Sequence, residues 1–219
     1  MTAKIINNFI SLEEIEQVND YYSNIPFASE GVHTDFPNKI QWQNSPIADW
    51  IWSDILDKKI RKEFGDYEIS HGCGVFQRCS MPFGMHIDSK QRITNENPQF
   101  ADTWKTEGFA LAIPLNEDPH FCTVFFDEYF NTDKEKFDSM KNFSELSDDE
   151  VINSGISKIY DLDFCWDDPR RKLQDHYKFD IAFPWKLGQA ATWGRTQLHV
   201  STDFAKHGLY KDCLTIFFE

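Results

Sequence analysis

A histidine and an aspartate two residues apart, His86 and Asp88 in the segment MHIDS, are the first candidates for chemistry in this chain. Side chains two apart on a β-strand point to the same side, so an imidazole and a carboxylate would converge on one point. His199 lies much later, in the β-type run GQAATWGRTQLHVS. Two histidines and one carboxylate on a rigid β scaffold form the facial triad of non-haem Fe(II), which leaves coordination positions open. The residue types therefore predict a metal site at His86, Asp88 and His199.

A lysine in the last predicted strand strengthens this prediction. Strand alternation in GLYKDCLTIFF puts Lys211 on the same face as Cys213, Thr215 and Phe217. A cation that faces a protein interior is costly unless it meets an anion. A dicarboxylate cosubstrate bound to the metal would supply that anion. On spacing alone, His86 and His199 could equally be separate core histidines, and Lys211 is the residue that favours a joint site.

Composition limits the class of protein. The 219 residues are 41% hydrophobic and 16% aromatic, which excludes a disordered chain and suits one domain. The net charge of -14 argues against a nucleic-acid partner, because phosphate backbones require clustered Lys and Arg. We therefore expect a small-molecule or peptide substrate. Nothing in the sequence indicates an oligomeric state.

Location and redox state follow from two further features. No apolar run reaches the roughly 18 to 20 residues that span a bilayer, and acidic residues interrupt the N-terminus before a signal-peptide core. We therefore expect a cytoplasmic protein that does not enter a membrane. The 5 cysteines are odd in number and form no CxxC pair, which predicts reduced thiols that lie mostly in the core.

The elements that must position the candidate residues divide the chain at residue 66. Residues 1–66 are expected to be a helical support, with one helix capped by Ser11 and Glu14 and a second from Ile47 to Phe64, ended by Gly65. Residues 67–219 contain β-type runs without alternating helices, which predicts a mainly β sandwich or jelly roll. The polar segment 131–177 is interpreted as a partly helical surface insertion within a single domain of residues 1–219.

At this point the chain resembles the 2-oxoglutarate and Fe(II)-dependent dioxygenases, particularly their prolyl-hydroxylase-like branch. MHIDS is similar to the family's His-x-Asp on an early core strand, TQLHVS to its distal histidine, and GLYKDCLTIFF to the segment that holds the cosubstrate. FALAIPLNED and CTVFFDEYF resemble the two strands between them. The resemblance covers about residues 70 to 219 and implies a double-stranded β-helix.

The resemblance also implies roles. His86, Asp88 and His199 would bind Fe(II) and be the catalytic residues, and Lys211, assisted by Thr215, would bind the far carboxylate of 2-oxoglutarate. Dioxygen would be the other cosubstrate, and hydroxylation with release of succinate and CO2 the expected outcome. The retained carboxylate of Asp88 argues against halogenation, because related halogenases lack it.

The chain departs from the family pattern at three places. Pro114 stands where relatives often carry a tyrosine, and the strand VFQRCS has Gln77, Arg78 or Cys79 at another such place. We assign Gln77 as the cosubstrate contact there. The spacing from His199 to the lysine is longer than usual, which leaves Lys206 as a weaker rival of Lys211.

Two other classes of protein stay open at this stage. One is a jelly-roll binding module without catalytic activity, in which the two histidines are core residues. The other is a cupin-like metal enzyme that does not use 2-oxoglutarate. Lys211 discriminates among the three, since only the oxygenase requires it.

Overall fold

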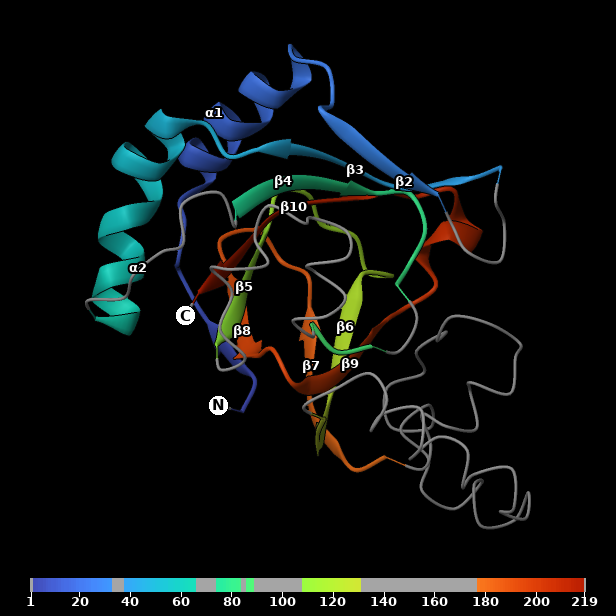
Figure 1. The fold of residues 1–219 in the computed structure, drawn as a ribbon. Coiled ribbons are helices and arrows are strands. Elements are labelled where there is room, and N and C mark those ends of the chain that lie inside the picture. The colour runs from blue at the N-terminus through green and yellow to red at the C-terminus, as the bar shows by residue number, and fades with distance from the viewer. Residues whose placement is uncertain are drawn as a thin grey trace, which may run out of the picture.

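The structure is a computed structural model, and it describes residues 2–32, 38–65, 74–83, 86–88, 108–130 and 177–218. In these ranges two antiparallel sheets face each other, and the helices cover the outer side of the larger sheet (Figure 1). The larger sheet has the strand order β1-β8-β5-β10-β4-β3-β2, and the smaller has β7-β6-β9. The predicted mainly β, jelly-roll class is confirmed.

The strands of the larger sheet are β1 Lys4–Ile6, β2 Ser29–Val32, β3 Ile40–Pro46, β4 Gly74–Cys79, β5 Phe109–Pro114, β8 Ala190–Gly194 and β10 Lys211–Phe218. Those of the smaller sheet are β6 Cys122–Tyr129, β7 Phe179–Pro184 and β9 Gln197–Ser201. The run GQAATWGRTQLHVS therefore contains two strands, β8 and β9, which belong to different sheets. This connection becomes important at the candidate site.

Two helical segments precede β4. The first, α1 (Leu12–Ser23), begins with the predicted capping box, in which Glu14 N donates to Ser11 Oγ at 3.2 Å and Ser11 N donates to Glu14 Oε2 at 2.8 Å. The second consists of a π-helical turn, Ile51–Leu56, and α2, Asp57–Phe64, which Gly65 ends at a φ of 80°. It starts later than predicted because Ile47 N donates to Gly74 O at 3.3 Å and so continues the pairing of β3 with β4.

The N-terminal part is not purely helical, which corrects the prediction for residues 1–66. It contributes β1, β2 and β3 to the larger sheet, at its two ends. Their sequences, KII, SEGV and IQWQNSP, are short or polar, and most of their side chains are exposed or half-buried. Backbone pairing with β8 and β4 defines these strands, and that signal is invisible in a hydrophobic pattern.

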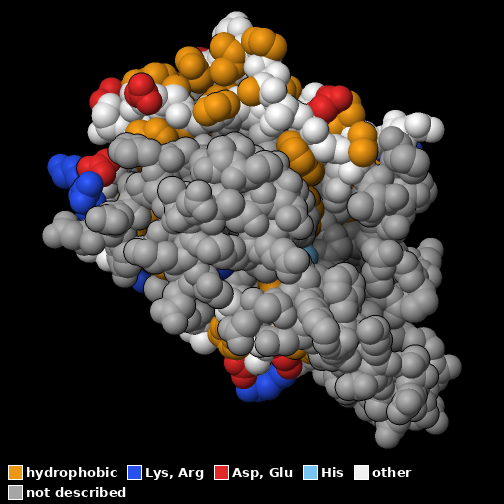
Figure 2. Space-filling view, in the orientation of Figure 1, with side chains coloured by type: hydrophobic (Ala, Val, Ile, Leu, Met, Phe, Trp, Pro, Cys, Tyr) orange, Lys and Arg blue, Asp and Glu red, His pale blue; other side chains and the backbone are white. Residues whose placement is uncertain are grey.

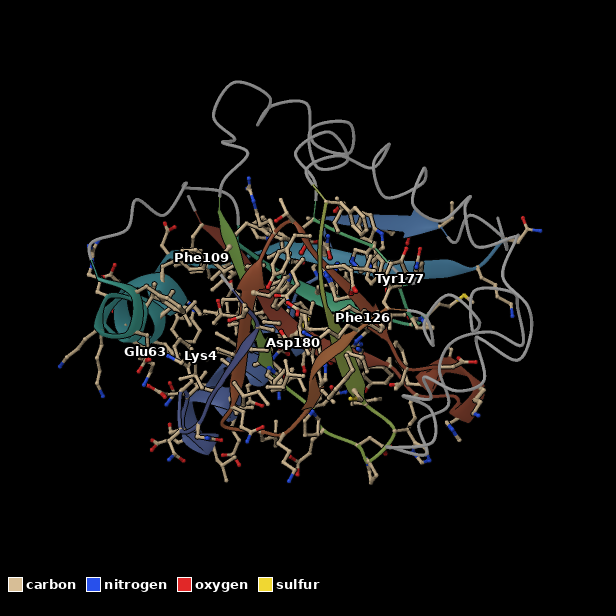
Figure 3. The ribbon with its side chains drawn as sticks, turned by 90° about the horizontal axis from the view of Figure 1, so that it is seen from below. Lys4, Glu63, Phe109, Phe126, Tyr177 and Asp180 are labelled. Atoms are coloured by element: carbon tan, nitrogen blue, oxygen red, sulfur yellow. The ribbon has the colours of Figure 1, made fainter. Side chains whose placement is uncertain are left out.

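Three layers of buried side chains hold the sheets in place. The outer layer packs Val18, Ile51 and Ile60 of the helices against the larger sheet. The middle layer lies between the sheets, and the third covers the far side of the smaller sheet. Figure 3 shows this order, with Phe109 on the side of α2 and Phe126 with Tyr177 on the opposite side. Residues on the inward faces of both sheets therefore share one interior.

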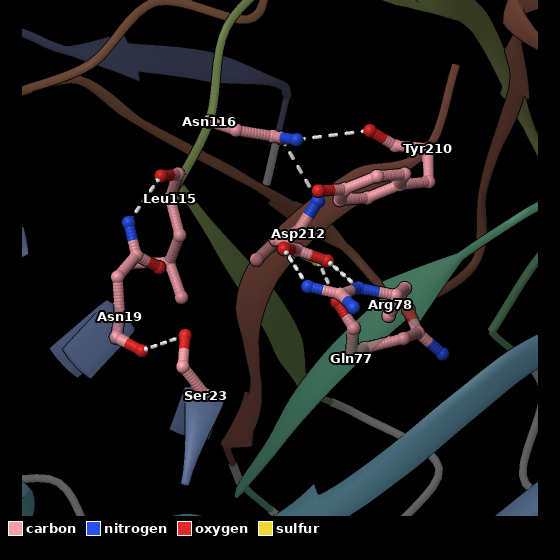
Figure 4. A network of polar contacts seen from close by, with 9 residues as sticks. Asn19, Ser23, Gln77, Arg78, Leu115, Asn116, Tyr210 and Asp212 are labelled. Carbon is pink, nitrogen blue, oxygen red and sulfur yellow. Dashed lines mark hydrogen bonds and ion pairs between the residues drawn. The ribbon is translucent and has the colours of Figure 1, made fainter. Parts of the chain in front are cut away.

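A polar network fixes the start of β10 (Figure 4). Arg78 Nε donates to Asp212 Oδ1 at 2.8 Å and its Nη2 donates to Oδ2 at 2.7 Å, while the guanidinium lies 4.3 Å from the centre of the Tyr210 ring. Asn116 accepts from Asp212 N at 2.9 Å and donates to Tyr210 O at 2.9 Å. These bonds tie β10 to β4 and to the end of β5, directly beside Lys211.

Replacing Asp212 with alanine should lower the free energy of unfolding by about 1.5 to 3 kcal/mol, the range for hydrogen bonds to charged groups. The pair is partly buried, since the Asp212 side chain is 9% exposed and that of Arg78 33%. The exposed pair of Arg61 with Asp57, at 49% and 42%, supplies the matched control, because such a pair is worth only about 0.3 to 0.5 kcal/mol. Urea unfolding of Asp212→Ala and of the control Asp57→Ala measures the two losses of unfolding free energy. Equal losses in the two variants would contradict a structural role for the network.

The exterior shows apolar side chains over the region of α1, β2 and β3 (Figure 2), where Leu12, Val32 and Ile40 are exposed. Among the described residues, no helix has the length and apolar character needed to cross a membrane. The predicted insertion 131–177 lies outside the described residues except for Tyr177.

Candidate metal centre

His86, Asp88 and His199 come together between the sheets. Their potential ligand atoms all lie within 4.8 Å of one another. Asp88 Oδ1 is 3.9 Å from His86 Nε2, and Asp88 Oδ2 is 3.7 Å from His199 Nε2. The imidazole rings of the two histidines have centroids 4.2 Å apart. The structure thus brings the three predicted ligands to one point.

Main-chain hydrogen bonds place these residues. His86 and His199 form an isolated antiparallel bridge, with N to O distances of 2.9 and 3.0 Å. Asp88 N donates at 2.8 Å to the carbonyl of Arg195, in the turn between β8 and β9. Within the described residues 86–88, the predicted His-x-Asp segment is thus joined to β9 by an isolated bridge and is not part of a named strand. His86 is held by its bridge to His199, and Asp88 by its bond to the turn before β9. These contacts suffice to turn both side chains toward His199.

The tautomer of His199 follows from its neighbour. His199 is 5% exposed, and its Nδ1 lies 2.9 Å from the carbonyl oxygen of Gln197. A carbonyl can only accept, so Nδ1 carries the proton and donates. Nε2 is then the ring nitrogen that faces Asp88, the arrangement of metal-binding histidines whose second nitrogen is tied to a carbonyl.

These residues fit a divalent transition metal. Adjacent ligand atoms that are each about 2.1 Å from one ion lie roughly 3 Å apart, and the histidine-to-aspartate separations of 3.9 and 3.7 Å come within about 1 Å of that value. Imidazole nitrogens with a single carboxylate suit iron and its neighbours, and this set leaves positions for other ligands.

Lys211 lies in the same interior. It is 2% exposed, its Nζ donates to Ser201 Oγ at 3.1 Å, and it stands 4.2 Å from the centre of the Trp185 ring. Ser201 follows His199 by two residues on β9, so both side chains point inward, at positions about 7 Å apart along the strand. The Lys211 ammonium group therefore contacts the inward side chain that follows His199 on β9.

Thr215 and Gln77 lie on the inward face between Lys211 and the row that contains Trp193. On this face Lys211 pairs with Cys79, and Cys213 pairs with Gln77 in the next row. Thr215 pairs with Ala112 in the row after that. Ala110 pairs with both Phe217 and Trp193 in the last of these rows. The Thr215 hydroxyl contacts Cys213 Sγ at 3.4 Å. The two residues thus occupy intermediate rows, and their contact with a cosubstrate stays a prediction. Lys206 is exposed in the short helix Phe204–His207, which places it away from this interior.

No cysteine of the described residues belongs to the group of potential metal ligands. Cys79, Cys122 and Cys213 are buried and unpaired with one another, as predicted for reduced core thiols, whereas Cys73 and Cys165 lie outside the described residues. Burial raises the pKa of Cys122 to about 12 and that of Cys213 to about 11. Both groups therefore stay protonated thiols at neutral pH.

Both thiols should therefore resist alkylation. At pH 8 the thiolate fraction of Cys213 is on the order of one in a thousand, and that of Cys122 is tenfold smaller, because both folded pKa values lie well above that pH. Iodoacetamide labelling followed by peptide mass spectrometry should show slow modification of both in the native protein and fast modification in guanidinium chloride. Fast labelling of native Cys213 would contradict its burial.

Sequence reasoning missed the supporting residues. Trp193 Nε1 donates to Asp88 Oδ2 at 2.9 Å, and Trp185 Nε1 donates to Thr123 Oγ1 at 2.9 Å, beside Ser201. Tryptophans in a β core are ordinarily packing residues, and their sequence positions do not say where each N–H points. Period-two counting from His199 does, however, place Ser201 on its face.

Known proteins share this fold. No model of a protein family matches the sequence, and no curated protein matches it. Among solved structures, the epimerase SnoN from nogalamycin biosynthesis, described as non-heme and alpha-ketoglutarate-dependent, has a TM-score of 0.55 at 8% identity over 99% of this chain and 77% of its own.

Two further structures agree with it. EctD from S. alaskensis with bound Fe gives a TM-score of 0.54 at 12% identity, over 99% of this chain and 72% of its own. HygX from Streptomyces hygroscopicus, with nickel and 2-oxoglutarate bound, gives 0.52 at 10% identity, over 99% and 82%. The chain therefore has the double-stranded β-helix fold that these metal-dependent proteins share, and its His86, Asp88 and His199 form a group that could bind a metal ion in that fold.

Proposed function

We propose that the chain is an Fe(II)- and 2-oxoglutarate-dependent oxygenase that hydroxylates an unactivated C–H group of a small metabolite, amino acid or peptidyl residue. The observation that carries the proposal is the convergence of His86, Asp88 and His199 on one point. A buried ammonium group, that of Lys211, shares their interior. A non-catalytic binding module requires neither of these features.

Each residue has a task in this reaction. The neutral His86 and His199 and the ionised Asp88 would hold Fe(II), which supplies the activation of dioxygen that no protein side chain provides. Lys211 would pair with the far carboxylate of 2-oxoglutarate, with Ser201 holding the ammonium group in place at 3.1 Å. Gln77, which pairs with Cys213, and Thr215, which pairs with Ala112, would line the cosubstrate between its two ends.

The overall reaction balances. One oxygen atom of O2 enters the C–H bond to give C–OH, and the other enters succinate as 2-oxoglutarate loses CO2. Substrate and 2-oxoglutarate each give up two electrons, which together reduce O2 by four. SnoN is described as an epimerase and SnoK, which has a TM-score of 0.52, as a carbocyclase, so proteins of this fold reach outcomes other than hydroxylation. Product analysis with 18O2 distinguishes hydroxylation from these outcomes.

A spectroscopic experiment tests the proposal. Anaerobic addition of Fe(II) and 2-oxoglutarate to the protein should produce a weak visible metal-to-ligand charge-transfer band. Succinate, which lacks the keto group, is the matched control and should give none. Metal binding without the band would indicate a cupin-like enzyme that does not use 2-oxoglutarate, and failure to bind metal would indicate a binding module. Succinate release across a panel of metabolites and peptides then identifies the substrate.

A further inference from the structure

We infer that Trp193 is a positioning residue that holds Asp88 as a metal ligand through one oxygen, an inference that rests on the proposed metal site. The indole Nε1–H donates to Asp88 Oδ2 at 2.9 Å. This bond engages lone-pair density on Oδ2, which lies 3.7 Å from His199 Nε2, and leaves Oδ1, which lies 3.9 Å from His86 Nε2 and does not accept from the indole, as the better donor to a metal. A carboxylate that used both oxygens would occupy an additional coordination position, which cosubstrate and dioxygen need.

Packing aims the indole independently of this hydrogen bond. Trp193 is 6% exposed, and its ring lies 5.2 Å from that of Phe125 and 5.3 Å from that of His199, centre to centre. Its strand β8 is paired on both sides, by β1 and β5. The N–H is therefore directed at Asp88 before a metal binds, which is the condition for a preorganised ligand.

The backbone of Asp88 is held by the same connection. Asp88 N donates to Arg195 O at 2.8 Å, two residues after Trp193. The end of β8 and the turn that follows it thus fix both the carboxylate and the main chain of Asp88. The chain also contains a natural comparison in Trp185, which is 7% exposed and donates its indole N–H to Thr123 Oγ1 at 2.9 Å, without contact to a metal ligand.

Trp193→Phe removes the N–H and keeps an aromatic ring. We expect its affinity for Co(II), measured anaerobically by calorimetric titration without 2-oxoglutarate, to fall by about 10- to 100-fold, the usual effect of losing a hydrogen-bond partner of a ligand. The visible spectrum of bound Co(II) should change as well, because the coordination by Asp88 changes. Trp185→Phe loses an equally buried indole N–H that is bonded to Thr123 and not to a proposed metal ligand, so it should leave the Co(II) affinity and spectrum unchanged; since its ring flanks Lys211, it is a control for metal binding and not for 2-oxoglutarate binding.

The outcomes separate this inference from the metal site itself. If the wild-type protein binds no Co(II), the proposed site fails and the role of Trp193 with it. If the wild-type protein binds Co(II) and Trp193→Phe binds it equally well with the same spectrum, the site stands and the role of Trp193 is overturned. Equal losses in the two tryptophan variants would also overturn it, because they would reflect general loosening of the interior.

A measurement that needs no tryptophan variant covers the case in which Trp193→Phe does not fold. In protein labelled with 15N at tryptophan, one indole N–H resonance should shift on addition of Zn(II), and the same resonance should shift in Asp88→Asn. If no indole resonance responds to Zn(II) bound by the protein, Trp193 does not act on the ligand.

Discussion

His199→Ala should abolish Fe(II) binding and, with it, all turnover of 2-oxoglutarate. The imidazole is the ligand that the β-sheet itself carries, with its tautomer set by the carbonyl of Gln197 at 2.9 Å. Loss of a direct ligand should weaken metal binding by more than the roughly 10- to 100-fold that loss of an outer hydrogen-bond partner costs. Calorimetric titration with Fe(II) under anaerobic conditions measures the affinity, and succinate formation measures turnover.

The control for this variant is His120→Ala. His120 is half-exposed, and its Nδ1 contacts Asp118 Oδ1 at 2.6 Å on the surface. Because His199 is buried, thermal unfolding must also show that His199→Ala still folds, and His199→Gln preserves more of the side-chain volume if it does not. Retention of wild-type metal affinity by a folded His199 variant would refute the metal centre.

Lys211→Ala should weaken 2-oxoglutarate binding by a hundredfold or more. Removal of one partner of a buried ion pair costs roughly 3 to 5 kcal/mol, and about 1.4 kcal/mol is tenfold in affinity. Lys211 is 2% exposed, and its ammonium group lies 4.2 Å from the centre of the Trp185 ring and 4.9 Å from that of Phe204, where water screens it poorly. Metal affinity should stay close to that of the wild type, since Lys211 is not a ligand.

Titration of 2-oxoglutarate into the anaerobic Fe(II) protein, followed by the charge-transfer band, gives the affinity. Lys178→Ala is the matched control, because Lys178 is an exposed cation paired with Asp127 at 2.5 Å on the surface. Lys211→Arg retains the charge and should recover part of the affinity. Wild-type affinity in Lys211→Ala would reject this residue as the anchor of the cosubstrate, even if the band itself is present.

The parts of the fold that sequence could predict are those with strong apolar patterns. The sequences of β5, β6 and β10 are rich in apolar residues, most of which are buried. The capping box at Ser11 is a signal that depends only on neighbouring residues. The edge strand β2, with the sequence SEGV, carries no such pattern, because its backbone is paired on one side and its side chains face solvent. Local sequence also cannot reveal that Ile47 extends the β3 pairing rather than starting a helix.

The candidate site also contains residues that the sequence could predict and residues that it could not. Residue types and spacing predicted His86, Asp88 and His199, because few side chains can bind a transition metal and two of the three stand at the His-x-Asp spacing. Trp193 and Ser201 could not be assigned, since their roles depend on which neighbour faces them across the interior. Trp193 reaches Asp88 from a position more than a hundred residues away, and only the pairing of the sheets makes them neighbours.

The place of β10 in the larger sheet has a consequence for biosynthesis. It lies between β5 and β4, and β4 precedes it in the sequence by more than a hundred residues. Until residues 211–218 have left the ribosome, β4 and β5 lack the neighbour that joins them. Pairings between such distant segments are slow to form, because much loop entropy is lost before contacts compensate for it. We therefore expect the nascent chain to acquire its native sheet only after synthesis has passed Phe218, and a fragment that stops before Lys211 to aggregate or be degraded.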